Sequence, residues 1–131
     1  MIVDDDAAVL SQLSALAAQL TDAKIVCFSS PKGALTAFAD APEKFQFVIT
    51  DLEMPGLDGI NFCRRLQAIS PGVKVLLSTG SRILTNAEAL QIGFCGLLFK
   101  PFPAAAMKKA LAVAGILNSA CERFSNALMP A

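Results

Sequence analysis

Three short apolar runs of this chain each end in charged side chains that are capable of chemistry. The runs and the residues that follow them are Met1–Val3 before Asp4 and Asp5, Phe47–Thr50 before Asp51, and Leu97–Phe99 before Lys100. A carboxylate at such a junction costs free energy if it is buried without a partner. Three apolar strands that each end in a charge therefore predict one charged pocket at one edge of a sheet.

The side chains at these junctions have complementary chemistry. Neighbouring carboxylates raise one another's pKa unless a cation lies among them, and Mg²⁺ binds one or two carboxylates together with waters and a phosphate. Asp51 has the nucleophilic oxygen needed to form an acyl phosphate. Thr79 follows the apolar run Val73–Ser78. Its hydroxyl and the ammonium group of Lys100 could each bind a phosphoryl oxygen. Gly80 leaves room for the phosphoryl group to approach. Cation, lysine and hydroxyl would share the charge of the transferring group.

Apolar spacing along the chain alternates between helical and strand-like patterns. The predicted strands are Met1–Val3, Lys24–Phe28, Phe45–Thr50, Val73–Ser78 and Cys95–Phe99. The predicted helices are Ala7–Leu20, Pro31–Asp40 with Ser30 as N-cap, Leu57–Ile69, Ile83–Ile92 and Pro103 to about Leu117. Apolar strands that alternate with helices predict a parallel sheet covered on both faces, with ligands outside the carboxyl ends of the strands.

Several residues near these junctions have a structural explanation. We expect Asp6 to cap a helix, Asp58 to cap a helix or form a turn, and Gly59 to allow close packing. Phe94 and Phe99 are expected in the core. The side chain of Glu53 either faces solvent or tunes the access of water to the acyl phosphate.

The composition indicates a single folded domain of 131 residues, with 54% hydrophobic and 17% charged residues. The formal net charge is zero and there is no basic run, so we expect no nucleic-acid contact. No apolar stretch approaches the length of a membrane span, about 20 residues, and no signal peptide is visible, which predicts a cytoplasmic protein without membrane contact.

The four cysteines are widely spaced, and the chain has no histidine. They are Cys27, Cys63, Cys95 and Cys121. This pattern argues against a zinc site. We expect the cysteines to be reduced and to pack as small apolar side chains, and not to form disulfides.

Four motifs together resemble the response-regulator receiver domain, the phosphoacceptor module of two-component signalling. They are Val3-Asp4-Asp5, the run from Thr50 to Gly59 that contains Asp51, Ser78-Thr79-Gly80, and Lys100-Pro101-Phe102. Each motif alone is weak, whereas four in order, each at a strand end, are specific. The resemblance implies a flavodoxin-like fold, a doubly wound five-stranded parallel sheet in the order 2-1-3-4-5 with five helices in three α/β/α layers.

The resemblance also implies a role for individual residues. Asp51 would be phosphorylated, and Thr79 and Lys100 would contact the phosphoryl group. Mg²⁺ or Mn²⁺ would bind directly to Asp5 and Asp51, to the backbone carbonyl of Glu53, and through water to Asp4. Pro101 would follow a cis peptide bond. The phosphoryl group would come from the histidine of a kinase or phosphotransfer protein. Phosphorylation would then switch a surface formed by the fourth helix, fifth strand and fifth helix. Such a domain is a signalling module that at most catalyses its own phosphorylation and dephosphorylation, and this chain would contain no DNA-binding domain.

One departure from the family concerns Leu97, which stands where receiver domains often have Tyr or Phe. Leucine at this position and the short run before Asp4 both suggest a receiver from a hybrid sensor kinase. We assign residues 1–118 to the receiver and residues 119–131 to an extension of the last helix or the start of a linker. A covalently linked kinase or effector domain and a homodimer are further expectations.

Three other classes of protein share part of this chemistry or part of this fold. A phosphatase of the haloacid-dehalogenase type also uses an aspartyl phosphate, but it needs a second aspartate two residues after the nucleophile, where this chain has Glu53. An interaction module that keeps only the receiver fold would not need the full set of site residues. A dinucleotide-binding domain is excluded because no GxGxxG follows the first strand.

Overall fold

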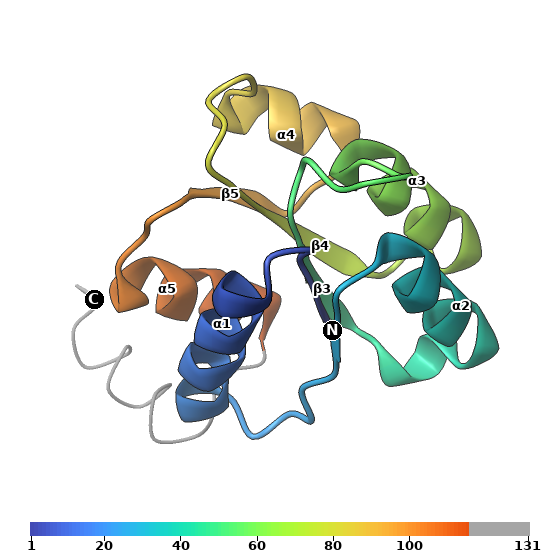
Figure 1. Ribbon diagram of the computed structural model, residues 1–131, viewed down its shortest axis with the longest axis horizontal. Helices are drawn as coiled ribbons and strands as arrows, with labels where there is room; N and C mark the ends of the chain where they lie inside the picture. The colour runs from blue at the N-terminus through green and yellow to red at the C-terminus, as the bar shows by residue number, and fades with distance from the viewer. Residues whose placement is uncertain (116–131) are drawn as a thin grey trace.

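Five parallel strands form one sheet in the order β2-β1-β3-β4-β5, so the predicted flavodoxin-like topology is confirmed (Figure 1). The structure is a computed structural model and describes residues 1–115. The strands are β1 (Ile2–Val3), β2 (Cys27–Phe28), β3 (Phe47–Thr50), β4 (Lys74–Thr79) and β5 (Gly96–Phe99). The helices are α1 (Ala7–Leu20), α2 (Pro31–Asp40), α3 (Gly59–Ile69), α4 (Asn86–Ile92) and α5 (Ala104–Ala114), with a 3-10 turn η1 (Pro42–Lys44).

Helices cover both faces of this sheet and give the molecule three layers (Figure 1). One face carries α2, α3 and α4, whose buried residues include Phe38, Phe62 and Ala89. The other face carries α1 and α5, which contribute Leu13 and Met107 to a second core. Burial on both faces explains why the strands read as continuous apolar runs in the sequence.

The register of the strands brings their carboxyl ends to one edge. Val3 of β1 lies opposite Thr50 of β3, and Thr79 of β4 lies opposite Phe99 of β5. The residues that follow these strand ends therefore start from neighbouring positions, as the sequence predicted.

Two helices begin later than the apolar spacing suggested, because polar side chains cap them further along the chain. The carboxylate of Asp58 accepts a hydrogen bond from the amide of Asn61, so α3 begins at Gly59 and not at Leu57. Thr85 and Glu88 form a capping box, so α4 begins at Asn86 and not at Ile83. The predicted caps Asp6 and Asp58 are confirmed, while Ser30 stands at the N-cap of α2 without a side-chain bond.

The strands differ from their predicted bounds by one to three residues at an end. Only the two residues of β1 pair with β2, which limits that strand to Cys27–Phe28. Phe45 ends the turn η1, so β3 begins at Phe47. The strand predicted as Val73–Ser78 is displaced by one residue and includes Thr79, and β5 begins at Gly96 and not at Cys95.

The last helix ends at Ala114, because Gly115 adopts the left-handed backbone conformation with φ 74°. The prediction that this helix begins at Pro103 and reaches about Leu117 is therefore wrong at both ends. The proposed extension over residues 119–131 lies outside the described residues. Within residues 1–115, no helix is both long and apolar enough to cross a membrane.

Candidate functional site

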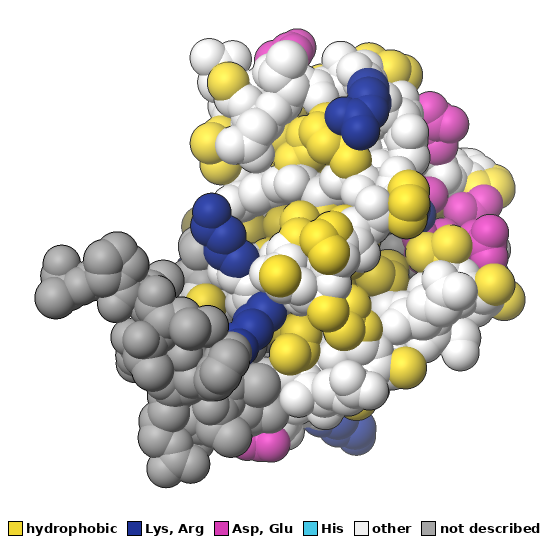
Figure 2. Space-filling view, turned by 90° about the vertical axis from the view of Figure 1, so that its left-hand side faces the viewer, with side chains coloured by type: hydrophobic (Ala, Val, Ile, Leu, Met, Phe, Trp, Pro, Cys, Tyr) yellow, Lys and Arg dark blue, Asp and Glu magenta, His cyan; other side chains and the backbone are white. Residues whose placement is uncertain are grey.

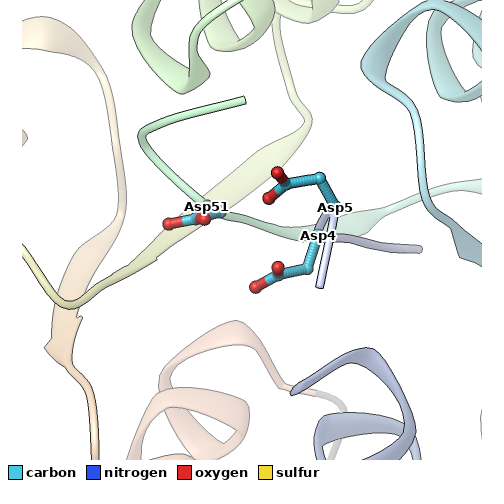
Figure 3. A group of neighbouring side chains, drawn as sticks. All are labelled: Asp4, Asp5 and Asp51. Atoms are coloured by element: carbon cyan, nitrogen blue, oxygen red, sulfur yellow. The ribbon is translucent and has the colours of Figure 1, made fainter. Parts of the chain in front are cut away.

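Three carboxylates meet at the carboxyl edge of the sheet. Asp4 and Asp5 follow β1 and Asp51 follows β3, and one oxygen from each lies within 4.8 Å of the others. Figure 3 shows the carboxylates of Asp4 and Asp5 turned toward the side of Asp51. Asp4 is only 1% exposed, Asp51 is partly buried and Asp5 is exposed, so the cluster extends from the protein interior to solvent.

Lys100 brings positive charge to this cluster. Its Nζ lies 2.6 Å from Oδ2 of Asp4 and 3.6 Å from Oδ1 of Asp51. The backbone amide of Lys100 donates a hydrogen bond of 2.8 Å to the carbonyl of Thr79. This bond holds the backbone of Lys100 beside the end of β4. The Lys100–Pro101 peptide bond is cis, as the resemblance implied.

Asp51 has an unusual electrostatic environment. Burial raises the pKa of its carboxyl above the usual range, the ammonium group of Lys100 opposes this rise, and the carboxylate of Asp4 adds to it. Its Oδ1 also accepts a hydrogen bond of 2.8 Å from the amide of Leu52. Carboxyl groups with a perturbed pKa in a cleft are frequent at functional sites, so this environment supports a functional role for Asp51.

Glycine at position 59 holds the segment after Asp51 in place. The Gly59 amide donates to the carbonyl of Leu52 at 2.7 Å. A Cβ atom at this position would lie 2.2 Å from the backbone oxygen of Asp51. The close packing predicted for Gly59 is therefore confirmed.

Thr79 forms the wall of the site on the side of β4. It is 1% exposed, and its Oγ1 accepts a hydrogen bond of 3.0 Å from the amide of Ser81. A cleft of about 550 Å³ runs across the carboxylates and this hydroxyl. The cleft is lined by Asp4, Asp5, Asp6, Val9, Asp51, Glu53, Thr79, Gly80, Ser81 and Lys100.

The structure thus brings together all six residues that the sequence singled out for chemistry. They are Asp4, Asp5, Asp51, Glu53, Thr79 and Lys100. Their donor set consists of hard carboxylate oxygens on one side and an ammonium and a hydroxyl on the other, which fits Mg²⁺ together with a phosphoryl group. A soft metal would instead favour thiol ligands, and Cys27, Cys63 and Cys95 are free and stand outside the set.

Sequence reasoning missed one pair beside the site. The guanidinium carbon of Arg82 lies 4.5 Å from the ring centroid of Phe99. Phe94 is buried as predicted, but Phe99 is partly exposed, so its assignment to the core was wrong. No residue pattern signals a contact between an arginine of an irregular loop and the last residue of a strand.

Comparison with known proteins identifies the class to which this fold and site belong. Residues 1–112 match the family model of the response regulator receiver domain, and the chain belongs to this family. The transcriptional regulatory protein FlgR of Helicobacter pylori is 34% identical over 102 residues, which cover 77% of this chain and 25% of FlgR. The transcriptional regulatory protein FixJ of Bradyrhizobium diazoefficiens is 34% identical over 104 residues, covering 77% of this chain and 48% of FixJ.

Solved structures agree with the family assignment. A response regulator receiver domain protein from Clostridium thermocellum superposes with a TM-score of 0.79 at 27% identity, covering 86% of this chain and 90% of that chain. A CheY from Borrelia burgdorferi, in complex with CheX, shares the fold with a TM-score of 0.74 at 20% identity, covering 86% of this chain and 85% of that chain. Since this chain spans half or less of FlgR and FixJ, their activities as whole proteins do not transfer to it.

Membership of the family defines the general role of the chain. Receiver domains are signalling domains of two-component response regulators and not conventional enzymes. They function with histidine kinases or phosphotransfer proteins and generally bind Mg²⁺ at an acidic pocket. A match across residues 1–112 also removes the need for the haloacid-dehalogenase alternative.

Proposed function

We propose that Asp51 accepts a phosphoryl group from the phosphohistidine of a partner kinase or phosphotransfer protein. The observation that carries this proposal is the position of Lys100, whose Nζ lies 2.6 Å from Asp4 and 3.6 Å from Asp51 within the acidic cluster. Asp51 is the cluster member that directly follows the central strand β3, and its partly buried side chain lines the cleft.

The transfer needs little beyond orientation and charge. A carboxylate oxygen of Asp51 attacks the phosphorus, a new O–P bond forms, and the P–N bond to the donor histidine breaks. The departing imidazole nitrogen keeps the electron pair of that bond. Lys100 and the hydroxyl of Thr79 are placed in the cleft to contact phosphoryl oxygens as their charge changes.

The metal ligands that we propose are Asp5, Asp51 and the backbone carbonyl of Glu53, with Asp4 acting through water. The contacts of Asp4 support this division, since one oxygen accepts from Lys100 and the other accepts from the amide of Asp6. Asp5 is exposed and belongs to the same cluster. Mg²⁺ or Mn²⁺ at this position would neutralise negative charge on the carboxylates and on the incoming phosphoryl group.

We place the output of phosphorylation on the surface of α4, β5 and α5. A cleft of about 300 Å³ on this surface is lined by residues that include Leu90, Leu97 and Lys109. Ile83 and Leu90 are 71% and 51% exposed. Figure 2 shows hydrophobic side chains gathered on the α5 side of the molecule with basic side chains around them, which suits binding to another protein.

Phosphoryl uptake provides the direct test. The protein is incubated with Mg²⁺ and phosphoramidate, and its intact mass is measured. We expect one added phosphoryl group in the natural chain and in Asp58→Asn, which alters an acid that caps α3 outside the cluster. Asp51→Asn should take up none, and uptake by that variant would overturn the assignment.

Further expectations belong to the same proposal. The receiver occupies residues 1–118, functions in the cytoplasm, and makes no contact with nucleic acid or membrane. A homodimer would use the surface of α4, β5 and α5. Whether the chain is joined to a kinase or to an effector would be decided by the full reading frame of the gene.

A further inference from the structure

Arg82 and Phe99 connect the loop after β4 to the end of β5. The guanidinium carbon of Arg82 lies 4.5 Å from the centroid of the Phe99 ring, within the range of an attractive cation–π contact. Phe99 pairs directly with Thr79 in the sheet, and Arg82 follows Thr79 by three residues. The contact therefore joins the loop after Thr79 to the strand residue that pairs with Thr79.

Thr79 and Phe99 face the same side of the sheet. Leu77 and Leu97 pack with the core beneath α2, α3 and α4, and side chains two residues further along each strand point to the same face. The Thr79 hydroxyl accepts from the amide of Ser81, the residue before Arg82. If this hydroxyl moves toward a phosphoryl group on Asp51, the bond to Ser81 breaks and the loop that holds Arg82 is released.

We infer that the Arg82–Phe99 contact is the latch that couples the phosphorylation site to the α4 surface in this chain. The inference rests on the proposed function, since phosphorylation of Asp51 is the event that breaks the Arg82–Phe99 contact. Phe99 supplies the aromatic ring on β5 that Leu97 does not. Ile83 follows Arg82 and is 71% exposed, so opening the latch moves an apolar side chain on the surface proposed to bind partners.

The binding of a phosphoryl mimic measures the strength of this coupling. Because the latch stabilises the unphosphorylated form, its loss should tighten the binding of beryllofluoride with Mg²⁺ by about two- to fivefold, the factor that corresponds to one exposed cation–π contact. We expect this change in Arg82→Gln. Arg82→Lys keeps a cation for the ring and should remain close to the natural chain.

A fluorescent reporter can follow the latch directly, because the chain contains no Trp and no Tyr. Phe99→Trp places a single indole under Arg82. Its emission should change when phosphoramidate and Mg²⁺ phosphorylate Asp51, and should not change in an Asp51→Asn background. Phe45→Trp is the matched control, since Phe45 stacks on Phe38 beside the opposite end of β3 and should give no response.

The possible outcomes separate the latch from the proposed function. Two results would overturn the latch and leave Asp51 as phosphoacceptor. One is phosphoryl uptake by Phe99→Trp without a change in its emission. The other is a beryllofluoride affinity of Arg82→Gln equal to that of the natural chain. Absence of phosphoryl uptake in the natural chain would overturn the proposed function and the latch with it. If Phe99→Trp does not fold, the affinities of the two Arg82 variants decide the question.

Discussion

Lys100 extends from the end of β5 to the buried carboxylate of Asp4, and its Nζ lies 2.6 Å from Oδ2. Asp4 is only 1% exposed, while the lysine side chain is 20% exposed. A carboxylate at that depth is costly unless a cation or several hydrogen bonds compensate it. The same ammonium is 3.6 Å from Asp51, so one lysine balances two acids.

Removal of this lysine should destabilise the metal-free protein. Lys100→Gln leaves Asp4 with no ammonium partner, and we expect a loss of about 1–3 kcal/mol in the free energy of unfolding, measured in urea with a chelator present. Mg²⁺ should restore more stability to this variant than to the natural chain, because a divalent cation replaces the missing charge. Lys32→Gln, at an exposed position on α2, is the control and should change neither quantity. Equal stability of Lys100→Gln and the natural chain would show that the ion pair contributes nothing.

Replacement of Asp51 should have the opposite effect on stability at neutral pH. Burial raises the pKa of this carboxyl, so the folded state binds its proton more tightly than the unfolded state does. The stability that Asp51 contributes is therefore present below the unfolded pKa, near 3.8, and is lost as the pH rises through the higher folded pKa. The charged form thus destabilises the fold near pH 7, and Asp51→Asn should be more stable there without metal.

The pH dependence of this gain provides the check. The stability difference between Asp51→Asn and the natural chain, measured by thermal unfolding with a chelator, should shrink as the pH falls toward 3.8. Asp40→Asn, at the exposed end of α2, controls for the change in net charge. A difference that is independent of pH would contradict the raised pKa.

The sequence predicted the site because the spacing of charges after apolar runs translates directly into the register of a parallel sheet. Val3 pairs with Thr50, and the acids that follow them are consequently neighbours. What the pattern could not provide was the depth of each acid. Asp4 and Asp5 are adjacent in the sequence, yet Asp4 is buried and Asp5 is exposed.

Element ends and loop contacts were the parts that sequence reasoning missed. Apolar spacing placed the start of α4 at Ile83, but the capping box of Thr85 and Glu88 moved it to Asn86 and left Ile83 exposed. A polar cap of two side chains overrides the weaker preference of an apolar residue for helix. The residues between Thr79 and this cap form the loop that carries Arg82, whose contact with Phe99 depends on tertiary structure alone.

The packing of Gly59 against Asp51 leads to a third prediction. A methyl group at position 59 would lie 2.2 Å from the backbone oxygen of Asp51, so Gly59→Ala must displace the segment that carries the phosphoacceptor. We expect a loss of about 1–3 kcal/mol in stability and a slower phosphoryl uptake. Gly72→Ala is the control, since no described atom lies within 4 Å of a Cβ there, and its stability should rise slightly or not change. Natural stability in Gly59→Ala would mean that this segment adjusts freely.

Ser78 and Thr50 offer a pair of buried hydroxyls with opposite predictions. Ser78 Oγ has no hydrogen-bond partner among the described residues, whereas Thr50 Oγ1 donates to the carbonyl of Asp51 at 3.0 Å. A buried hydroxyl without a partner costs free energy, so Ser78→Ala should raise the free energy of unfolding by about 1 kcal/mol. Thr50→Val keeps the shape of the side chain but removes its hydrogen bond, and should lower that free energy by about 1 kcal/mol. Urea unfolding of both variants tests the contrast, and a loss of stability in Ser78→Ala would indicate that a buried water satisfies its hydroxyl.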